Sequence, residues 1–375
     1  MDYRILKKID TDTAIGKRII SFLITEKNRK KLSAYLKGRL RAKMLRHEFE
    51  DRASNLKDLV NSSEQHITPV TQPLVLISLL SRSGGILLGQ LFDGHPKIHV
   101  HPGELSIAIG NQEKFTTPKM EFGDNPKSWL AFFAENTISR HLKEVHINLE
   151  KVNSTQQFVF IPYLQKRIFL RYLKSLNRFD LRQMYDAYMT SYFGAWLNNV
   201  NFSGKDKKYI VGYSPSLAMN DESVKQYFGV YPEGKLISIL RDPQKWIESN
   251  LLHNKDYPVA ATAISHWRKA AQSMLRNKKT FGDRVCIIRF EDLTAKTEAV
   301  MDYLSKILNI EYGGILLTPT FNQTRIKRQD YLESSKALEI NLFKQPKGIR
   351  LEEIDSNYHQ TIEDYKSVLS KTVQI

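Results

Sequence analysis

The sequence has almost no cysteine and no long apolar run. Its 375 residues include a single cysteine, Cys286, so no disulfide can form within the chain and a reducing compartment is allowed. Cys286 stands in an apolar stretch, where we expect a small core residue rather than a nucleophile. No segment is long enough to cross a bilayer as a helix, and Lys17 and Arg18 interrupt the apolar residues 14–24 that a signal peptide would need. These features predict a cytoplasmic protein.

Acidic residues are also scarce. The chain has 56 lysines and arginines but only 40 aspartates and glutamates, which gives a formal net charge of +16. Such an excess predicts anionic partners, without choosing among nucleotide, polysaccharide, nucleic acid and membrane. The sequence has no zinc-ligand pattern, no RNA-binding signature and no series of stacking aromatics. Nucleic acid is therefore the least favoured of these partners.

Half of the basic excess lies in the first 50 residues, which hold 14 Lys and Arg against 6 Asp and Glu. Within residues 28–50, leucines recur near helical spacing, which predicts an amphipathic helix. Its apolar face could pack on the rest of the protein or make a peripheral contact with an anionic membrane. Residues 51–73 are polar and end in prolines, as a linker would. We therefore predict a basic helical extension and linker over residues 1–70 and an α/β domain over residues 71–375.

The first candidate site follows an apolar run, residues 74–80, predicted to be a buried strand. The chain then turns through Arg82-Ser83-Gly84-Gly85 into residues 86–92, predicted to be a helix. A strand that enters a helix through glycines presents unpaired N–H groups and the positive end of the helix dipole at one point, which favours an anion. Arg82 adds a planar fork of donors suited to phosphate or sulfate. Taken alone, the loop is also typical of an ordinary strand–helix connection.

A second strand, predicted over residues 235–240, ends in Arg241-Asp242-Pro243. Proline fits the first turn of a helix, so Asp242 is placed to cap it and Arg241 lies at the carboxyl end of the strand. Ligands of open α/β sheets bind at that edge, and two strand-end arginines predict a ligand that is anionic at two ends. Strands alternating with helices predict a P-loop-like three-layer α/β fold, with a central, mostly parallel sheet flanked by helices.

These motifs resemble those of the sulfotransferases that use 3′-phosphoadenosine 5′-phosphosulfate (PAPS). The family has Arg/Lys-Ser-Gly-Thr-Thr between a strand and a helix, often followed by His-Pro; here residues 82–86 and His95-Pro96 correspond. Its second motif is a strand, Arg-Asp-Pro and a serine eight residues after the arginine, which Arg241 and Ser249 match. Residues 289–293 are similar to its strand ending in Tyr-Glu-Asp-Leu. The pattern is closest to the Arg-Ser-Gly branch of carbohydrate and tyrosylprotein sulfotransferases.

The resemblance implies transfer of a sulfuryl group from PAPS to a hydroxyl or amine of an acceptor. That acceptor would be a saccharide, a glycolipid or other lipid-linked glycan, or a small molecule, and the reaction needs no metal. Arg82 would also act in catalysis, by stabilising charge on the oxygen that bridges phosphate and sulfur. The implied cofactor-binding residues are Arg82, Ser83, Gly84, Gly85 and Ile86 for the 5′-phosphosulfate, Arg241 and Ser249 for the 3′-phosphate, and Arg325, Lys327 and Arg328 in a loop that closes over the cofactor. The alternative for that loop is a solvated basic segment.

The acceptor must lose a proton, so a base is needed within hydrogen-bond reach of it. In relatives of the Arg-Ser-Gly type, a glutamate shortly after His-Pro serves, and Glu104 falls at about that place. His101 is the second candidate; it alternates with His99 and would share a face of an extended segment with it. A metal site formed by His95, His99, His101 and Glu104 is the less favoured alternative, because the spacing matches no zinc pattern.

The sequence departs from the family at two places. The paired threonines are Gly85 and Ile86, so side-chain hydroxyls are missing from the loop, and Tyr213 replaces a lysine that relatives often have before Ser/Thr-Pro. These departures predict either a lower affinity for the cofactor or a non-catalytic relative that binds an anion or a membrane. A P-loop kinase or NTPase is a further alternative, since Asp242 ends a strand. The loop lacks the lysine followed by Ser/Thr that such enzymes use.

Overall fold

The computed structural model describes residues 67–78, 80–105, 125–127, 129, 159–176, 179–201, 206–253, 260–326 and 350–373. They lie in a compact unit that runs from Ile67 to Ile375. The predicted helix, linker and membrane contact within residues 1–66 lie outside the described residues, so the domain boundary near residue 70 stays a prediction. Among the helices described, none is long and apolar enough to cross a membrane.

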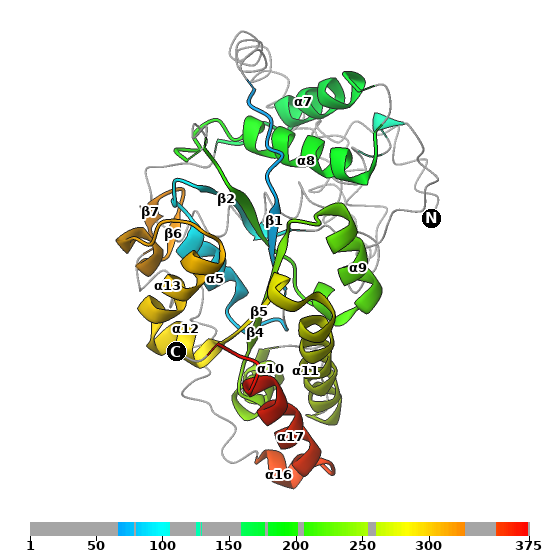
Figure 1. Ribbon diagram of the computed structural model, residues 1–375, viewed down its shortest axis with the longest axis vertical. Coiled ribbons are helices and arrows are strands. Elements are labelled where there is room, and N and C mark those ends of the chain that lie inside the picture. The colour runs from blue at the N-terminus through cyan, green and yellow to red at the C-terminus, as the bar shows by residue number, and fades with distance from the viewer. Residues whose placement is uncertain are drawn as a thin grey trace, which may run out of the picture. The chain divides into compact units, whose positions relative to one another are not determined.

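A five-stranded sheet lies at the centre of the unit, in the order β2-β3-β1-β4-β5 (Figure 1). Every neighbouring pair of strands is parallel, which confirms the predicted fold class. The strands are β1 (Leu74–Ile77), β2 (Ile98–Glu104), β3 (Tyr209–Tyr213), β4 (Lys235–Leu240) and β5 (Val285–Arg289). Strand β4 has the predicted bounds, whereas β1 ends three residues earlier than the apolar run that predicted it.

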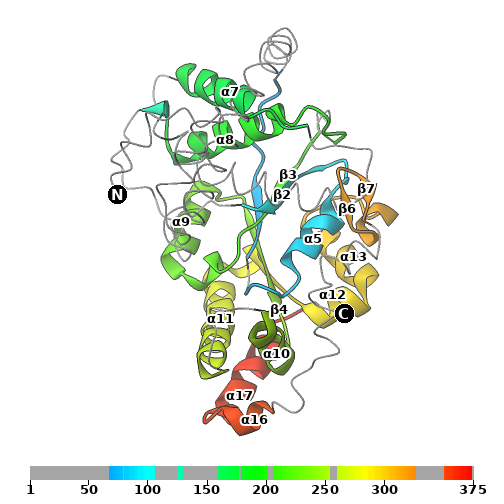
Figure 2. The same ribbon diagram turned by 180° about the vertical axis from the view of Figure 1, so that it is seen from behind.

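Helices cover both faces of this sheet. Figures 1 and 2 show α5 (Gly85–Phe92), α12 (Phe290–Ala295) and α13 (Thr297–Ile307) on one side and α9 (Asp221–Val230) and α11 (Ala260–Phe281) on the other. The strand residues alternate accordingly: Val75 and Ile77 pack in the core under α5, while Leu74 and Leu76 pack in the opposite core. Burial on both faces explains why the strands are almost uniformly apolar.

The remaining elements extend these two layers. Helices α7 (Pro162–Lys174) and α8 (Leu181–Ala195) pack against each other, and α17 (Tyr358–Leu369) packs on α11. Strands β6 (Thr320–Phe321) and β7 (Thr324–Arg325) form a separate short hairpin. The others are α10 (Pro243–His253), α16 (Leu351–Ile354) and the single turns Leu217–Met219, Gly282–Arg284 and Gly314–Leu317.

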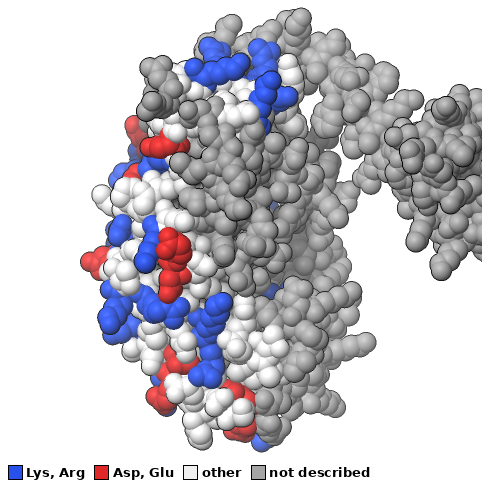
Figure 3. All heavy atoms as spheres, turned by 90° about the vertical axis from the view of Figure 1, so that its right-hand side faces the viewer, with Lys and Arg blue, Asp and Glu red and all other residues white. Residues whose placement is uncertain are grey.

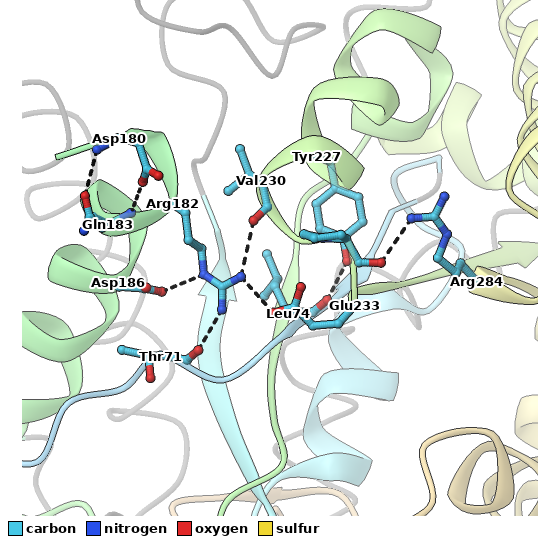
Figure 4. Close-up of polar contacts among 11 residues, drawn as sticks. Thr71, Leu74, Asp180, Arg182, Gln183, Asp186, Tyr227, Val230, Glu233 and Arg284 are labelled. Atoms are coloured by element: carbon cyan, nitrogen blue, oxygen red, sulfur yellow. Dashed lines mark hydrogen bonds and ion pairs between the residues drawn. The ribbon is translucent and has the colours of Figure 1, made fainter.

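A partly exposed ionic network ties α8 to the amino-terminal edge of the sheet (Figure 4). Arg182 donates hydrogen bonds to Asp186 at 3.0 Å, to Glu233 at 2.8 Å and to the carbonyl oxygen of Thr71, just before β1, at 2.7 Å. Burial raises the pKa of Asp186 to about 6, against the opposing effect of the Arg182 charge. Because Arg182 on α8 contacts Thr71 and Glu233, two positions distant from it in sequence, it fixes the edge of the sheet opposite to the one where ligands of this fold class bind.

The buried His99 predicts how stability depends on pH. Burial, with a smaller effect from the Lys207 charge, lowers the pKa of His99 to about 3. An unfolded histidine titrates near pH 6.5, so below that pH the unfolded state binds a proton that the folded state does not bind. The His99→Gln variant lacks this difference in proton binding. We expect the urea-unfolding free energy of wild type to fall relative to that of the variant by about 1.4 kcal/mol per pH unit between about pH 6.5 and pH 4. Parallel profiles for the two proteins would contradict the assignment.

Candidate active site

The loop between β1 and α5 has the geometry of an anion site. Its backbone is left-handed at Arg82 (φ 65°) and at Gly84 (φ 92°). Arg241 donates a hydrogen bond to the carbonyl oxygen of Arg82, and the Trp246 indole donates to that of Ser81 at 2.9 Å. These contacts hold a conformation that a non-glycine residue rarely adopts. Alternation of left-handed and ordinary conformations turns successive N–H groups toward one side, directly before the amino terminus of α5.

Gly84 is required both by its backbone and by its neighbour Phe290. Its positive φ disfavours a side chain, and a Cβ there would lie 2.7 Å from the Phe290 ring. The same ring lies under the Arg241 guanidinium, 4.7 Å from ring centre to Cζ. Phe290 therefore shapes the loop and supports Arg241 at once. No sequence pattern assigned a role to Phe290, although it stands in the stretch that resembles the family's third motif.

Three predicted site residues meet beside this loop. Arg82, after β1, donates through Nε to Oγ of Ser249 on α10 at 3.1 Å, and Arg241, after β4, donates to the Arg82 carbonyl. Burial lowers the pKa of both arginines, and the Arg82 charge lowers that of Arg241 further. Two adjacent, half-buried guanidinium groups repel each other, so a ligand with several negative charges would be stabilised between them.

Several buried polar atoms near the arginines have no hydrogen-bond partner within the described part of the chain. They include Oγ of Ser83, Nε of Arg241 and Oε2 of Glu291, whose other oxygen accepts from the Asp242 amide at 3.1 Å. Buried polar groups are nearly always paired in native proteins, and leaving one unpaired costs about 1–3 kcal/mol. The Ser83 hydroxyl and the Arg241 Nε are donors, so these two atoms fit an anion.

Asp242 caps α10, as predicted. Its Oδ1 accepts from the Lys245 amide at 3.0 Å, its carbonyl accepts from the Trp246 amide at 2.9 Å, and Pro243 occupies the first helical position. The Trp267 indole donates to the Arg241 carbonyl at 3.1 Å. The backbone on both sides of this turn is thus fixed, which aims the Arg241 side chain at the loop.

Glu104 lies at the same edge of the sheet. It ends β2 and pairs in register with Tyr213, which ends β3, and the following amide of Leu105 donates to the Tyr213 carbonyl at 2.5 Å. The pairing of β2 with β3 shifts register between Val100 and Glu104, and such an irregularity changes the direction of the side chains at the end of β2. Glu104 is partly buried, and its charge together with burial raises the pKa of Tyr213. The carboxyl ends of β2, β3, β1 and β4 thereby bring Glu104, Arg82 and Arg241 to one edge.

His101 lies deeper than Glu104, against α8. It is 2% exposed, its ring centre is 4.4 Å from that of Tyr192, and the Tyr188 hydroxyl is 3.4 Å from its Nε2. His99 faces the same helix, with its ring 4.9 Å from that of Phe193, so the two histidines share a face as predicted.

His95 stabilises the turn before β2. Its Nε2 donates to the Glu311 carbonyl at 2.8 Å and its Nδ1 accepts from the Lys97 amide at 3.2 Å, which fixes the turn before β2. Within the described ranges, neither these histidines with Glu104 nor any other acidic, histidine or cysteine side chains form a group of three that could hold a metal ion.

Arg325 is exposed on the β6–β7 hairpin, which is held by Asp93: its carboxylate accepts from the Thr320 hydroxyl at 2.7 Å and from the Gln323 amide at 2.9 Å. Asp93 follows the carboxyl terminus of α5, whereas the anion-binding loop precedes its amino terminus. Lys327 and Arg328 lie outside the described residues. Cofactor binding by this basic loop stays a prediction.

Residues 73–313 match the sulfotransferase family. The chain belongs to that family. Membership makes the protein a sulfotransferase, an enzyme of a family that uses PAPS, and the kinase interpretation is wrong. The finer assignment to the Arg-Ser-Gly branch of carbohydrate and tyrosylprotein enzymes stays a prediction. A comparison with curated proteins found no match.

Several solved structures that are similar to this chain are sulfotransferases. The sulfotransferase domain of the Synechococcus PCC 7002 olefin synthase is 20% identical, with 82% of this chain and 99% of that one covered and a TM-score of 0.48. A domain from the curacin biosynthetic pathway is 17% identical, with 82% and 100% covered and a TM-score of 0.44. Mouse sulfotransferase SULT7A1, in complex with PAP, is 11% identical, with 84% and 92% covered and a TM-score of 0.31.

Proposed function

We propose that this sulfotransferase moves a sulfuryl group from PAPS to a hydroxyl or amine of a saccharide, a lipid-linked glycan or a small molecule. The supporting observation is the meeting of Arg82, Ser249 and Arg241 beside the amino terminus of α5. PAPS supplies an activated sulfuryl group, with negative charge developing on the oxygen that bridges it to the 5′-phosphate. The unpaired donors of Ser83 and Arg241 fit such an anion.

The cofactor-binding residues fall into two groups, one for each end of PAPS. The backbone of residues 83–86 and the Arg82 side chain would hold the 5′-phosphosulfate and stabilise charge on its bridging oxygen. Arg241 and Ser249 would hold the 3′-phosphate. Glu104, at the end of β2, would accept the proton from the acceptor oxygen or nitrogen. His101 remains the second choice for that base.

Basic and acidic side chains both occur on the described part of the face in Figure 3. On α11, for example, Arg276 pairs with Asp221 of α9 at 3.0 Å. The basic segment 28–50, for which we proposed a membrane contact, lies outside this surface description.

The 3′-phosphate site predicts a strong nucleotide preference. We expect 3′-phosphoadenosine 5′-phosphate (PAP) to bind about ten- to a hundredfold more tightly than AMP or ATP, because a charge-assisted contact to the 3′-phosphate is available only to PAP. Calorimetric titration measures all three. In Arg241→Ala the advantage of PAP over AMP should largely disappear, whereas Arg276→Ala, an exposed arginine on α11, should leave it unchanged. Equal affinity of wild type for PAP and AMP would refute the proposed site.

A further inference from the structure

Gly85 and Tyr213, two of the three residues that depart from the family pattern in this region, lie against each other. A Cβ added to Gly85 would lie 2.4 Å and 2.6 Å from the Cε2 and Cδ2 atoms of the Tyr213 ring and 3.0 Å from its Cζ. Real side chains do not approach so closely. The Tyr213 ring therefore occupies the space into which a threonine at position 85 would project, and its hydroxyl-bearing end lies over the first turn of α5.

Tyr213 is anchored for this position. Its backbone pairs with Ile77 of β1 on one side and with Glu104 of β2 on the other, so the residue is placed between the anion-binding loop and the carboxylate expected to act as base. The residue is 7% exposed, and its ring lies against Gly85 at the start of α5. A phenol held in this way at the edge of an anion site is a preorganised donor.

We propose that the Tyr213 hydroxyl donates a hydrogen bond to the sulfuryl group of PAPS and thereby replaces the hydroxyl that Gly85 lacks. This inference rests on the proposed function of the site. No covalent bond to Tyr213 forms or breaks. The residue only donates a hydrogen bond to an oxygen of the sulfuryl group. Burial and the Glu104 charge raise the pKa of Tyr213, so the hydroxyl keeps its proton throughout the pH range in which the enzyme would work.

Tyr213→Phe tests the hydroxyl alone, since it keeps the ring over Gly85. We expect the affinity for PAPS, measured by competition against PAP, to fall roughly ten- to a hundredfold. The affinity for PAP, which lacks the sulfuryl group, should stay within about twofold of wild type. Tyr209→Phe, at the opposite end of β3, is the matched control and should change neither. Unchanged PAPS affinity in Tyr213→Phe, or an equal loss for PAP and PAPS, would overturn the assignment.

A second experiment tests the interlocked pair. Gly85→Ala should weaken PAP binding by tenfold or more in wild type and in the Tyr213→Phe background, because the ring blocks the new Cβ in both. In a Tyr213→Ala background the same change should be nearly neutral, since the ring is absent. Equal effects of Gly85→Ala in all three backgrounds would refute the coupling. Failure of wild type to bind PAP would instead refute the proposed function, so the two failures are distinguishable.

Discussion

Glu104→Gln is expected to lower the rate of sulfate transfer from labelled PAPS by about 10²–10⁴-fold while PAP affinity stays near that of wild type. General-base catalysis contributes this range, and the amide keeps the shape of the side chain but cannot take up a proton at neutral pH. Glu104 is partly buried at the end of β2, and its neighbour in register, Tyr213, is far less able to act as a base because its pKa is raised. The rate of sulfate transfer is measured with any acceptor found by screening. The affinity for PAP is measured by calorimetry on the same sample, so the two effects are separated.

The control for this experiment is Glu222→Gln, an exposed glutamate in the first turn of α9, which should leave turnover unchanged. Full activity of Glu104→Gln would show that the base lies elsewhere. His101→Gln would then be the next variant, although the burial of His101 against Tyr188 and Tyr192 makes a loss of stability the expected result there.

Removal of the Arg82 side chain should reduce both turnover and PAP binding. Loss of one preorganised donor to developing charge costs about 10²–10³ in rate, and PAP shares the 5′-phosphate that Arg82 would hold, so its affinity should fall about ten- to a hundredfold. Because Arg82 has a φ of 65°, Arg82→Ala keeps the Cβ and hence the backbone strain of wild type, whereas Arg82→Gly removes the side chain and that strain together. Similar losses in both variants would assign the effect to the guanidinium rather than to the backbone.

Two further variants sharpen this result. Arg82→Lys keeps a charge but loses the planar fork and the Nε contact to Ser249, and should restore only part of the activity. Arg276→Ala controls for the general loss of a positive charge. Normal binding and turnover in Arg82→Gly would mean that the loop is an ordinary strand–helix connection.

Much of the fold follows from local patterns. The apolar runs of β1 and β4 predicted buried parallel strands, and Asp242-Pro243 predicted the start of α10, because strands buried on both faces and helix caps leave signals within a few residues. The predicted strand ran to Leu80, whereas β1 ends at Ile77. Leu80 is buried in the core but does not pair with a neighbouring strand. Burial and strand pairing are different constraints, and hydrophobicity reports only the first.

The chemical groups of the site can be identified in the amino-acid sequence alone: two strand-end arginines, a glycine-containing loop and a glutamate after His-Pro, in the order that marks a sulfotransferase. How these groups meet depends on the folded chain. It set the Phe290 ring between Gly84 and Arg241, placed Tyr213 over Gly85 and kept Arg325 at the far end of α5. These contacts join residues far apart in the chain, and they depend on the strand order β2-β3-β1-β4-β5. Parallel neighbours are connected by long crossovers, so no local pattern encodes which strand ends lie side by side.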